Sequence, residues 1–506
     1  MPSHKDPESS TNTTEMPRTI TLLRAISLIM GSIIGTGIFM SPKTIVSEVG
    51  SIGWALIIWI FTGLFALFGG IAYLELGLMM KKSGAEYTYL QYTFGSWIGY
   101  ILAFVNMLVL RPISACIMAF TFSEYVISIF TGGSGLGEQS HFMNICFALL
   151  LLWGVSLINM YSTTISLKAQ TLFLYSKLML AAFIIFAGMK AIFVDGKIDN
   201  FTNGNGGIWA GSTITSSSIA KAVFAGLWPY DAWNNLNFMI EEIQNPEKNM
   251  KNAILISLPG VIVIYLLINV SYFTFLTTFE IKESAAIAVF FGEKAFYDWI
   301  NVLTPFLVAI SALGAFNGMV LSTSRFAMVA GRDGNLPSWY SLISFDYKTP
   351  ISSLFIQCFL SSIYLLPKNA SFHTLLDVFA FAQLFVYGLT FSSLIILRSR
   401  EPNNDRPFKI YLPIAYFLAI FSFFNVFIPL FLSPRWEYVW VIIMVFVAFC
   451  FYKILIVNEK KFITDFNVRF ENYLCERFNL VRAYKERNED SVRMGGGNKG
   501  NYMRMD

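Results

Sequence analysis

The stretch GLWPYDAWNN, residues Gly226 to Asn235, interrupts an otherwise apolar segment that runs from Ile219 to Ile240. It introduces a proline, an aspartate and a cluster of aromatic residues into that segment. If the segment crosses a membrane, a charged Asp near its centre costs roughly 2.5–3.5 kcal/mol on insertion scales. A chain that keeps Asp231 there must surround the carboxylate with polar groups. The rest of the sequence indicates which function such a polar region inside the membrane has.

The composition identifies the chain as a polytopic membrane protein. Of its 506 residues, 55% are hydrophobic and 13% are charged, whereas soluble domains carry about 25% charged residues. The formal net charge of +4 is mild and no basic face is clustered, so we expect no nucleic-acid partner. The three histidines lie far apart, and no nucleotide-binding, metal-binding or acid–base constellation is present. We therefore expect no metal, no cofactor, no catalytic residues and no enzyme activity.

About twelve apolar segments, spans 1 to 12, are long enough to cross the roughly 30 Å of membrane hydrocarbon. They cover residues 22–46, 52–77, 96–130, 142–160, 167–193, 216–243, 252–278, 295–328, 350–367, 374–397, 408–432 and 436–457. The predicted fold is an all-α integral membrane protein whose twelve-helix domain occupies residues 21–457. Residues 1–20 are predicted to form a disordered tail. Residues 458–506 are predicted to begin with an amphipathic helix and to end in a disordered Gly-rich stretch.

Basic residues between the spans set the predicted orientation. With the N-terminus inside, the inner connections hold most of the Lys and Arg residues, for example Lys81, Arg332 and Arg400. Both termini are therefore predicted to be cytoplasmic. The sequons at Asn200 and Asn369 then fall outside, where N-glycosylation is possible. These sequons favour the secretory route, and the predicted location is the plasma membrane, although the sequence does not distinguish it from an internal membrane.

A second interruption lies in span 1, where GSIIGTGIFMSP (31–42) places three glycines within seven residues. For either span alone, a simple kink or close helix packing is as good an explanation as a binding site. If spans 1–5 and 6–10 are structural repeats, however, the two interruptions occupy matching positions, which is the best sequence indication of a transporter's binding site. Freed amides at a half-helix N-terminus suit a carboxylate, and freed carbonyls suit an ammonium. A site with both suits an amino acid.

Four motifs now reveal a family resemblance. GSIIGTGIFMSPK (31–43), KKSGAEYTYL (81–90), GLWPYDAWNNLNFMIEEIQNPEKN (226–249) and FNG (316–318) resemble the amino acid–polyamine–organocation superfamily. Within it, the chain looks like the light chains of heteromeric amino acid transporters over about residues 20–460, and most like the b(0,+) subtype for neutral and dibasic amino acids. The resemblance implies a LeuT-like fold, a 5+5 inverted repeat with broken helices 1 and 6.

The resemblance also implies how an L-amino acid is held. Amides around Gly35, Thr36 and Gly37 would bind its carboxylate. The carbonyls that would bind its α-ammonium lie near Ile33, Trp228 and Asp231. The Trp228 side chain would close over the site from outside.

The Asp231 carboxylate would receive the cationic end of arginine, lysine or ornithine. The alternative is a structural Asp that is bonded to freed amides of span 6 or to a buried Lys. Ser114 in span 3 and Tyr387 in span 10 are weaker candidates for lining the cavity. Ser114 could equally bond backbone carbonyls, and Tyr387 could simply be packing. Pro229 and Lys221 also stand in or near span 6, and the sequence gives no account of their roles.

Lys177 is a second costly charge, in the middle of span 5. In sodium-coupled relatives of the implied fold a sodium ion bridges spans 1 and 8, and the resemblance places the Lys177 ammonium there as a fixed substitute. This favours a sodium-independent transporter. The alternatives are a lysine that snorkels to the membrane interface and one that carries a proton.

The chain departs from the family pattern in the outer loop between spans 3 and 4. Light chains normally carry a cysteine there for a disulfide to a single-span glycoprotein heavy chain, but FTGGSGLGEQSHFMN (130–144) has none, and Cys146 falls inside span 4. A heavy chain, if present, is therefore expected to bind non-covalently. The function predicted first is sodium-independent exchange of cationic and neutral amino acids. A proton- or sodium-coupled symporter of the same fold is the nearest alternative, and a non-transporting amino acid sensor is a more distant one.

Overall fold

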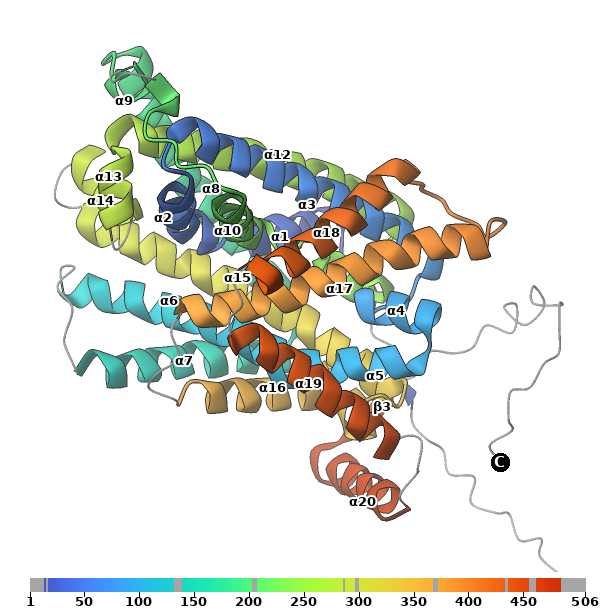
Figure 1. The fold of residues 1–506 in the computed structure, drawn as a ribbon. Helices are drawn as coiled ribbons and strands as arrows, with labels where there is room; N and C mark the ends of the chain where they lie inside the picture. Colours follow the sequence, from blue (N-terminus) through green and yellow to red (C-terminus); the bar gives the residue numbers. More distant parts are fainter. Residues whose placement is uncertain are drawn as a thin grey trace, which may run out of the picture.

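Long helices form most of the chain in the computed structural model, which describes residues 13–14, 17–131, 139–202, 207–284, 287–295, 300–366, 372–432, 436–454 and 461–483. The first half contains α1 (Leu22–Ile33), α2 (Gly37–Val49), α3 (Ile52–Met80), α4 (Glu86–Phe94), α5 (Ser96–Val105), the π-helical turn η1 (Asn106–Leu110), α6 (Arg111–Thr131), α7 (Gln139–Tyr161), α8 (Thr163–Phe193), α9 (Asp199–Thr202) and η2 (Gly207–Trp209). The second half contains α10 (Ser216–Leu227), η3 (Trp228–Tyr230), α11 (Asn235–Phe238), η4 (Ile240–Glu242), α12 (Pro246–Phe275), α13 (Thr278–Glu283), α14 (Ile287–Ala295), α15 (Ile300–Arg332), η5 (Ser338–Ser341), α16 (Ile351–Tyr364), α17 (Phe372–Arg400), α18 (Leu412–Leu432), α19 (Trp436–Tyr452) and α20 (Lys461–Phe478). Most of the long helices run in the same general direction (Figure 1).

Seven described helices are long and apolar enough to cross a membrane, and an eighth crossing results if the bent pair α1 and α2 is one span. Three shorter apolar helices follow at Ile351–Tyr364, Leu412–Ile428 and Tyr438–Tyr452. The predicted sixth span is divided at Leu227 into short pieces. The helical membrane fold is thus as predicted, whereas the number of twelve crossings and the inverted repeat stay predictions.

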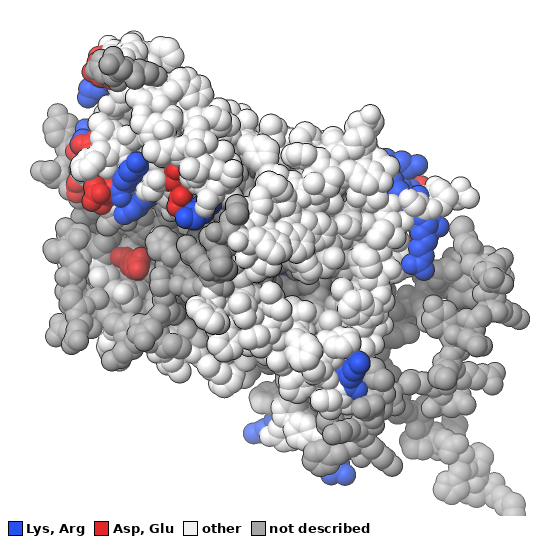
Figure 2. All heavy atoms as spheres, in the orientation of Figure 1, with Lys and Arg blue, Asp and Glu red and all other residues white. Residues whose placement is uncertain are grey.

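The surface has the pattern expected of a protein embedded in lipid. On the face in Figure 2, Lys, Arg, Asp and Glu gather toward the two ends, and a broad region between them is free of charge. Large apolar side chains such as Phe186, Phe446 and Trp440 are exposed along the helices, at 69%, 66% and 62%. Because an aqueous surface would not favour so many exposed rings, these side chains are expected to contact membrane hydrocarbon.

Ion pairs close the end of the bundle that the basic residues predict to be cytoplasmic. Arg325 on α15 binds Glu242 through two bonds of 2.8 and 3.1 Å, and both side chains are buried. Arg332 binds Glu241 at 3.1 Å, and Lys82 binds Asp333 at 2.8 Å. The Arg325 and Arg332 pairs fasten α15 to the segment that follows the second helix break, and the Lys82 pair fastens the end of α15 to the connection between α3 and α4.

A small sheet at the same end is the one departure from an all-helical fold among the described residues. Strands β1 (Thr13–Thr14), β3 (Leu480–Ala483) and β2 (Leu342–Ser344) lie in that order, with β1 parallel and β2 antiparallel to β3. Ile20 also pairs with Ile243, just beyond the second break. Parts of both predicted tails are therefore paired with the membrane domain. The division into domain and tails stays a prediction.

Candidate functional site

The two helix breaks face each other at the centre of the bundle. The first separates α1 from α2 with a bend of 40°, and the second separates α10 from α11 across residues 228–234. A β-carbon built on Gly37 would lie 2.6 Å from Pro229 Cα, so only glycine permits this approach. The Tyr265 hydroxyl on α12 lies 2.7 Å from the Ile33 carbonyl oxygen and 3.1 Å from that of Pro229, and so bridges the two breaks.

The first break leaves backbone amides free. α2 begins at Gly37, and no acceptor for the amides of Thr36 and Gly37 is found among the described residues. The first amides of a helix also carry the positive end of its dipole. This is the arrangement that favours a carboxylate, as predicted for this segment.

The carbonyls expected to hold an α-ammonium are already partly engaged. The Ile33 oxygen accepts from the Gly35 amide at 2.7 Å and from Tyr265. The Trp228 oxygen accepts from the Asp231 amide at 3.1 Å, which leaves it one lone pair. An ammonium can therefore use the Trp228 carbonyl as it stands, but the Ile33 carbonyl only if a present donor moves.

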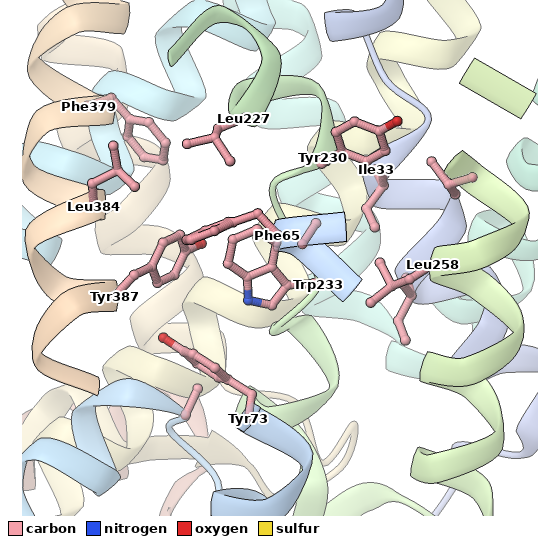
Figure 3. Packing of buried hydrophobic residues seen from close by; sticks show 14 of the residues in the cluster. Ile33, Phe65, Tyr73, Leu227, Tyr230, Trp233, Leu258, Phe379, Leu384 and Tyr387 are labelled. Atoms are coloured by element: carbon pink, nitrogen blue, oxygen red, sulfur yellow. The ribbon is translucent and has the colours of Figure 1, made fainter. Parts of the chain in front are cut away.

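Asp231 directs its carboxylate toward α17, where the Tyr387 hydroxyl donates a hydrogen bond to Oδ1. The Tyr387 ring packs on Trp233 with centroids 4.6 Å apart, and Figure 3 shows these two side chains lying together between α17 and the second break. Tyr387 is 3% exposed, whereas Asp231 is only partly buried. One carboxylate oxygen is thus held by Tyr387, and the group still faces the cavity.

Trp228 lies over the same region and meets Phe379 of α17 edge-on, with ring centroids 5.5 Å apart. Phe379, Leu227 and Leu384 form an apolar layer whose side chains lie near one another in Figure 3, and they line a small hollow together with Trp228 and Asp231. The predicted closing role of Trp228 is compatible with this packing. Phe379 is a second aromatic residue in the layer, and the sequence analysis did not identify it.

The predicted substrate-binding residues line a single cavity between the two breaks. Ile33, Gly35, Thr36, Gly37, Ser114, Trp228, Asp231 and Tyr387 all line it. Its volume of about 40 Å³ has room for only a few water molecules. An amino acid therefore fits only when the surrounding side chains move apart, as a carrier that alternates between closed and open forms requires.

Arg111 also lines the cavity, and the sequence analysis did not predict this role. It begins α6 directly after the π-helical turn η1, and its guanidinium lies 3.5 Å from the fully buried Glu86 carboxylate. Glu86 also accepts a hydrogen bond of 3.1 Å from Asn234, within the second break. The signal was present in the sequence, because a charge within an apolar span is as costly for Arg111 as for Asp231.

Lys177 on α8 is 2% exposed and donates a hydrogen bond to the Gly31 carbonyl of α1. A β-carbon built on Gly314 of α15 would lie 3.0 Å from the Lys177 ammonium. The ammonium therefore lies between α1 and α15, which correspond to spans 1 and 8. It does not snorkel to an interface.

The predicted glycosylation site at Asn200 and the cysteine Cys146 lie outside the cavity. The Asn200 amide donates to the Phe273 carbonyl at 3.0 Å, so glycosylation there requires that this bond break. Asn369 and residues 132–138 of the outer loop lie outside the described residues. Cys146 is exposed on α7. Among the described residues, no group of His, Cys, Asp and Glu is placed to hold a metal.

Comparison with known proteins agrees with this geometry. Residues 20–452 match the family described as amino acid permease. The chain belongs to the amino acid permease family. It is 35% identical over 442 residues to the b(0,+)-type amino acid transporter 1 of Homo sapiens, covering 87% of this chain and 88% of that relative. It is 33% identical over 421 residues to the Asc-type amino acid transporter 1 of Mus musculus, covering 81% of this chain and 77% of that relative. It is 34% identical over 412 residues to the cystine/glutamate transporter of Homo sapiens, covering 81% of this chain and 79% of that relative.

Membership of the amino acid permease family confirms the resemblance that the motifs around the two breaks indicated. It makes the chain a multi-pass membrane transporter rather than an enzyme, and it supports amino acids as the cargo. The relatives differ in the amino acids that their names specify, so substrate choice must be argued from the cavity itself.

Proposed function

We propose that this protein exchanges cationic and neutral L-amino acids across the plasma membrane without sodium. The observation that carries the proposal is the Asp231 carboxylate, which faces the cavity between the two helix breaks. The free amides of Thr36 and Gly37 bind the substrate carboxylate, and carbonyls of the second break bind the α-ammonium. These groups bind the carboxylate and the α-ammonium that every amino acid carries, whereas Asp231 binds the cationic side chain.

The charge balance around the cavity supports a cationic side chain. Arg111 and Asp231 line the cavity, and Glu86 pairs with Arg111 from behind. The carboxylates of Asp231 and Glu86 and the guanidinium of Arg111 together carry one net negative charge. Because Glu86 neutralises Arg111, Asp231 is the group left to attract arginine, lysine or ornithine. Neutral substrates remain acceptable because Tyr387 satisfies one Asp231 oxygen when no cation is bound.

The position of Lys177 supports sodium independence. Its ammonium binds the Gly31 carbonyl between α1 and α15, which supports the proposal that it replaces the sodium ion that the resemblance places between spans 1 and 8. The competing function is proton-coupled symport, and Lys177 is also the group that favours it, since a buried lysine can release a proton. Exchange is preferred because an empty cavity leaves Asp231 and the free amides poorly satisfied, which slows the return of an empty carrier.

We further propose that both termini are cytoplasmic, where the ion pairs and the small sheet lie. The protein works alone or with a non-covalently bound heavy chain, because the loop at 130–144 contains no cysteine.

The proposal is tested by counterflow into vesicles that contain this protein alone. Labelled arginine and labelled leucine are supplied outside, with unlabelled amino acid inside, with and without sodium and with and without a proton gradient. The expected result is uptake of both labels that needs internal amino acid and is unaffected by sodium or the gradient. Uptake into vesicles without internal amino acid, driven by either ion, would replace exchange by symport.

A further inference from the structure

A second cavity lies on the opposite side of α17 from the substrate site. It is enclosed by α4, α5, η1, α17, α18 and α19, and all eighteen described residues that line it are apolar. Its volume is about 450 Å³, about three times the roughly 150 Å³ of an engineered apolar cavity that stays dry and binds benzene. A packed membrane protein gains nothing from a void of this size, which indicates that it has an occupant.

The cavity is open to the membrane. Its floor is buried: Leu110, Phe381 and Val426 are 0%, 5% and 2% exposed. Its rim is exposed on the side of the bundle that contacts hydrocarbon, where Phe385 and Ile442 are 38% and 51% exposed. The occupant therefore enters sideways from the lipid and not through the substrate path.

The lining selects an unsubstituted hydrocarbon chain. A free amino acid needs partners for two charges, and a sterol needs one for its hydroxyl, since a buried polar group without a hydrogen bond costs several kcal/mol. The indole of Trp97, at one end of the cavity, is the only side chain in the described lining that carries a polar atom. From Trp97 to Leu110 the helical rise covers about 20 Å, more than the roughly 15 Å depth of one leaflet. A complete acyl chain fits this length.

Basic residues stand at the Trp97 end, which the loop charges predict to be cytoplasmic. Arg400 ends α17 and donates to the Thr93 carbonyl at 3.4 Å, just before α5 begins. Lys453 follows α19, whose Tyr452 ring lies 5.5 Å from that of Tyr100 on α5. A phospholipid headgroup at this mouth would meet these two cations and the Glu401 carboxylate beside Arg400, and the one net positive charge favours an anionic headgroup.

We propose that an anionic phospholipid of the cytoplasmic leaflet inserts one acyl chain into this cavity and braces α17. Phe381, Ala382 and Phe385 of α17 face the chain, whereas Gln383 and Tyr387 of the same helix line the substrate cavity. The chain therefore supports the helix whose Tyr387 holds Asp231. The apolar binding site does not depend on the proposed function, whereas the choice of the cytoplasmic leaflet and this link to the substrate rest on it.

The test is photolabelling of the purified full-length protein in nanodiscs. The probe is phosphatidylserine with a diazirine in the middle of one chain, and peptide mapping locates the label. We expect labelling on α5, α17 and α19, reduced about tenfold in Ala382→Leu, which fills the floor, and in Ile442→Trp, which narrows the exposed rim. Gly154→Leu is the matched control, because it adds the same side chain to an exposed position on α7 with nothing within 4 Å. Excess unlabelled phosphatidylserine displaces the label from the wild type.

Two results would overturn the proposal. One is labelling that neither filling variant reduces although both remain folded by thermal unfolding. The other is labelling of the cavity by a competing probe that equals or exceeds labelling by the phosphatidylserine probe. If that probe is a diazirine sterol, the site belongs to a sterol. If it is a diazirine phosphatidylcholine, the site has no preference for an anionic headgroup. Since labelling requires no transport, failure of the exchanger proposal leaves this result unaffected, and the converse also holds.

Discussion

The two helix breaks supply different chemistry, although both interrupt a membrane helix at the same depth. The break between α1 and α2 contributes free amides and carries no charged side chain, so it can recognise only what all amino acids share. The break after α10 contributes Asp231 and the partly buried Trp228, which can recognise how amino acids differ. From this comparison we propose that general binding and substrate selection are divided between the breaks. Changes in the first should affect all substrates equally, and changes in the second should separate them.

The largest effect is expected from Gly37→Ala. The new methyl group would lie 2.6 Å from Pro229 Cα and force the two breaks apart. Overpacking of this kind costs roughly 1–3 kcal/mol, so arginine and leucine counterflow should both fall about tenfold or more. Gly154→Ala on α7, where no described residue lies within 4 Å of the added β-carbon, is the matched control and should be neutral. A mutant that lost only arginine would contradict the division between the breaks.

A smaller effect is expected from Lys177→Gln. The substitution keeps a donor for the Gly31 carbonyl but removes the fixed charge between α1 and α15. A hydrogen bond from a charged group is worth roughly 1.5–3 kcal/mol, so counterflow of both substrates should fall about tenfold with their ratio unchanged. Lys168→Gln, an exposed lysine on the same helix, should have no effect. If instead the wild type lost its activity as pH changed while Lys177→Gln became independent of pH, Lys177 would be a proton carrier.

The smallest effect is expected from Ser114→Ala. Ser114 lines the cavity on α6 and is 4% exposed. Hydrogen bonds between membrane helices average about 0.6 kcal/mol, so transport of either substrate should change less than about threefold. Initial rates over a range of arginine and leucine concentrations would detect this change. A tenfold loss would add Ser114 to the groups that bind the backbone of the substrate.

The sequence predicted the parts of the site that have local signals. Glycine, proline and aspartate inside apolar spans mark both breaks, and these anomalies identified Gly37, Asp231 and Lys177 before any geometry was known. The family motifs then connected these residues to substrate groups. Each of these features is visible within a few residues of sequence.

The parts that were missed depend on contacts between distant segments. Glu86 lies within the KKSGAEYTYL motif (81–90) far from span 3 and span 6 in the sequence, and only the fold brings it to Arg111 and Asn234. Phe379 and Tyr265 look like ordinary aromatic residues of membrane helices until α17 and α12 place them beside the breaks. The short sheet likewise joins strands that are separated by more than a hundred residues, which no local pattern indicates.

The most direct test of the central claim compares arginine with citrulline, which has nearly the same shape without the positive charge. Competition for leucine counterflow would be measured in the wild type and in Asp231→Asn, which keeps the size of the side chain. If Asp231 recognises the cation, the wild type should prefer arginine over citrulline by at least about tenfold, which corresponds to roughly 1.4 kcal/mol of binding free energy. The Asp231→Asn variant should lose this preference while it continues to transport leucine. An arginine preference that survives in Asp231→Asn would contradict the account and make Asp231 a structural residue held by Tyr387.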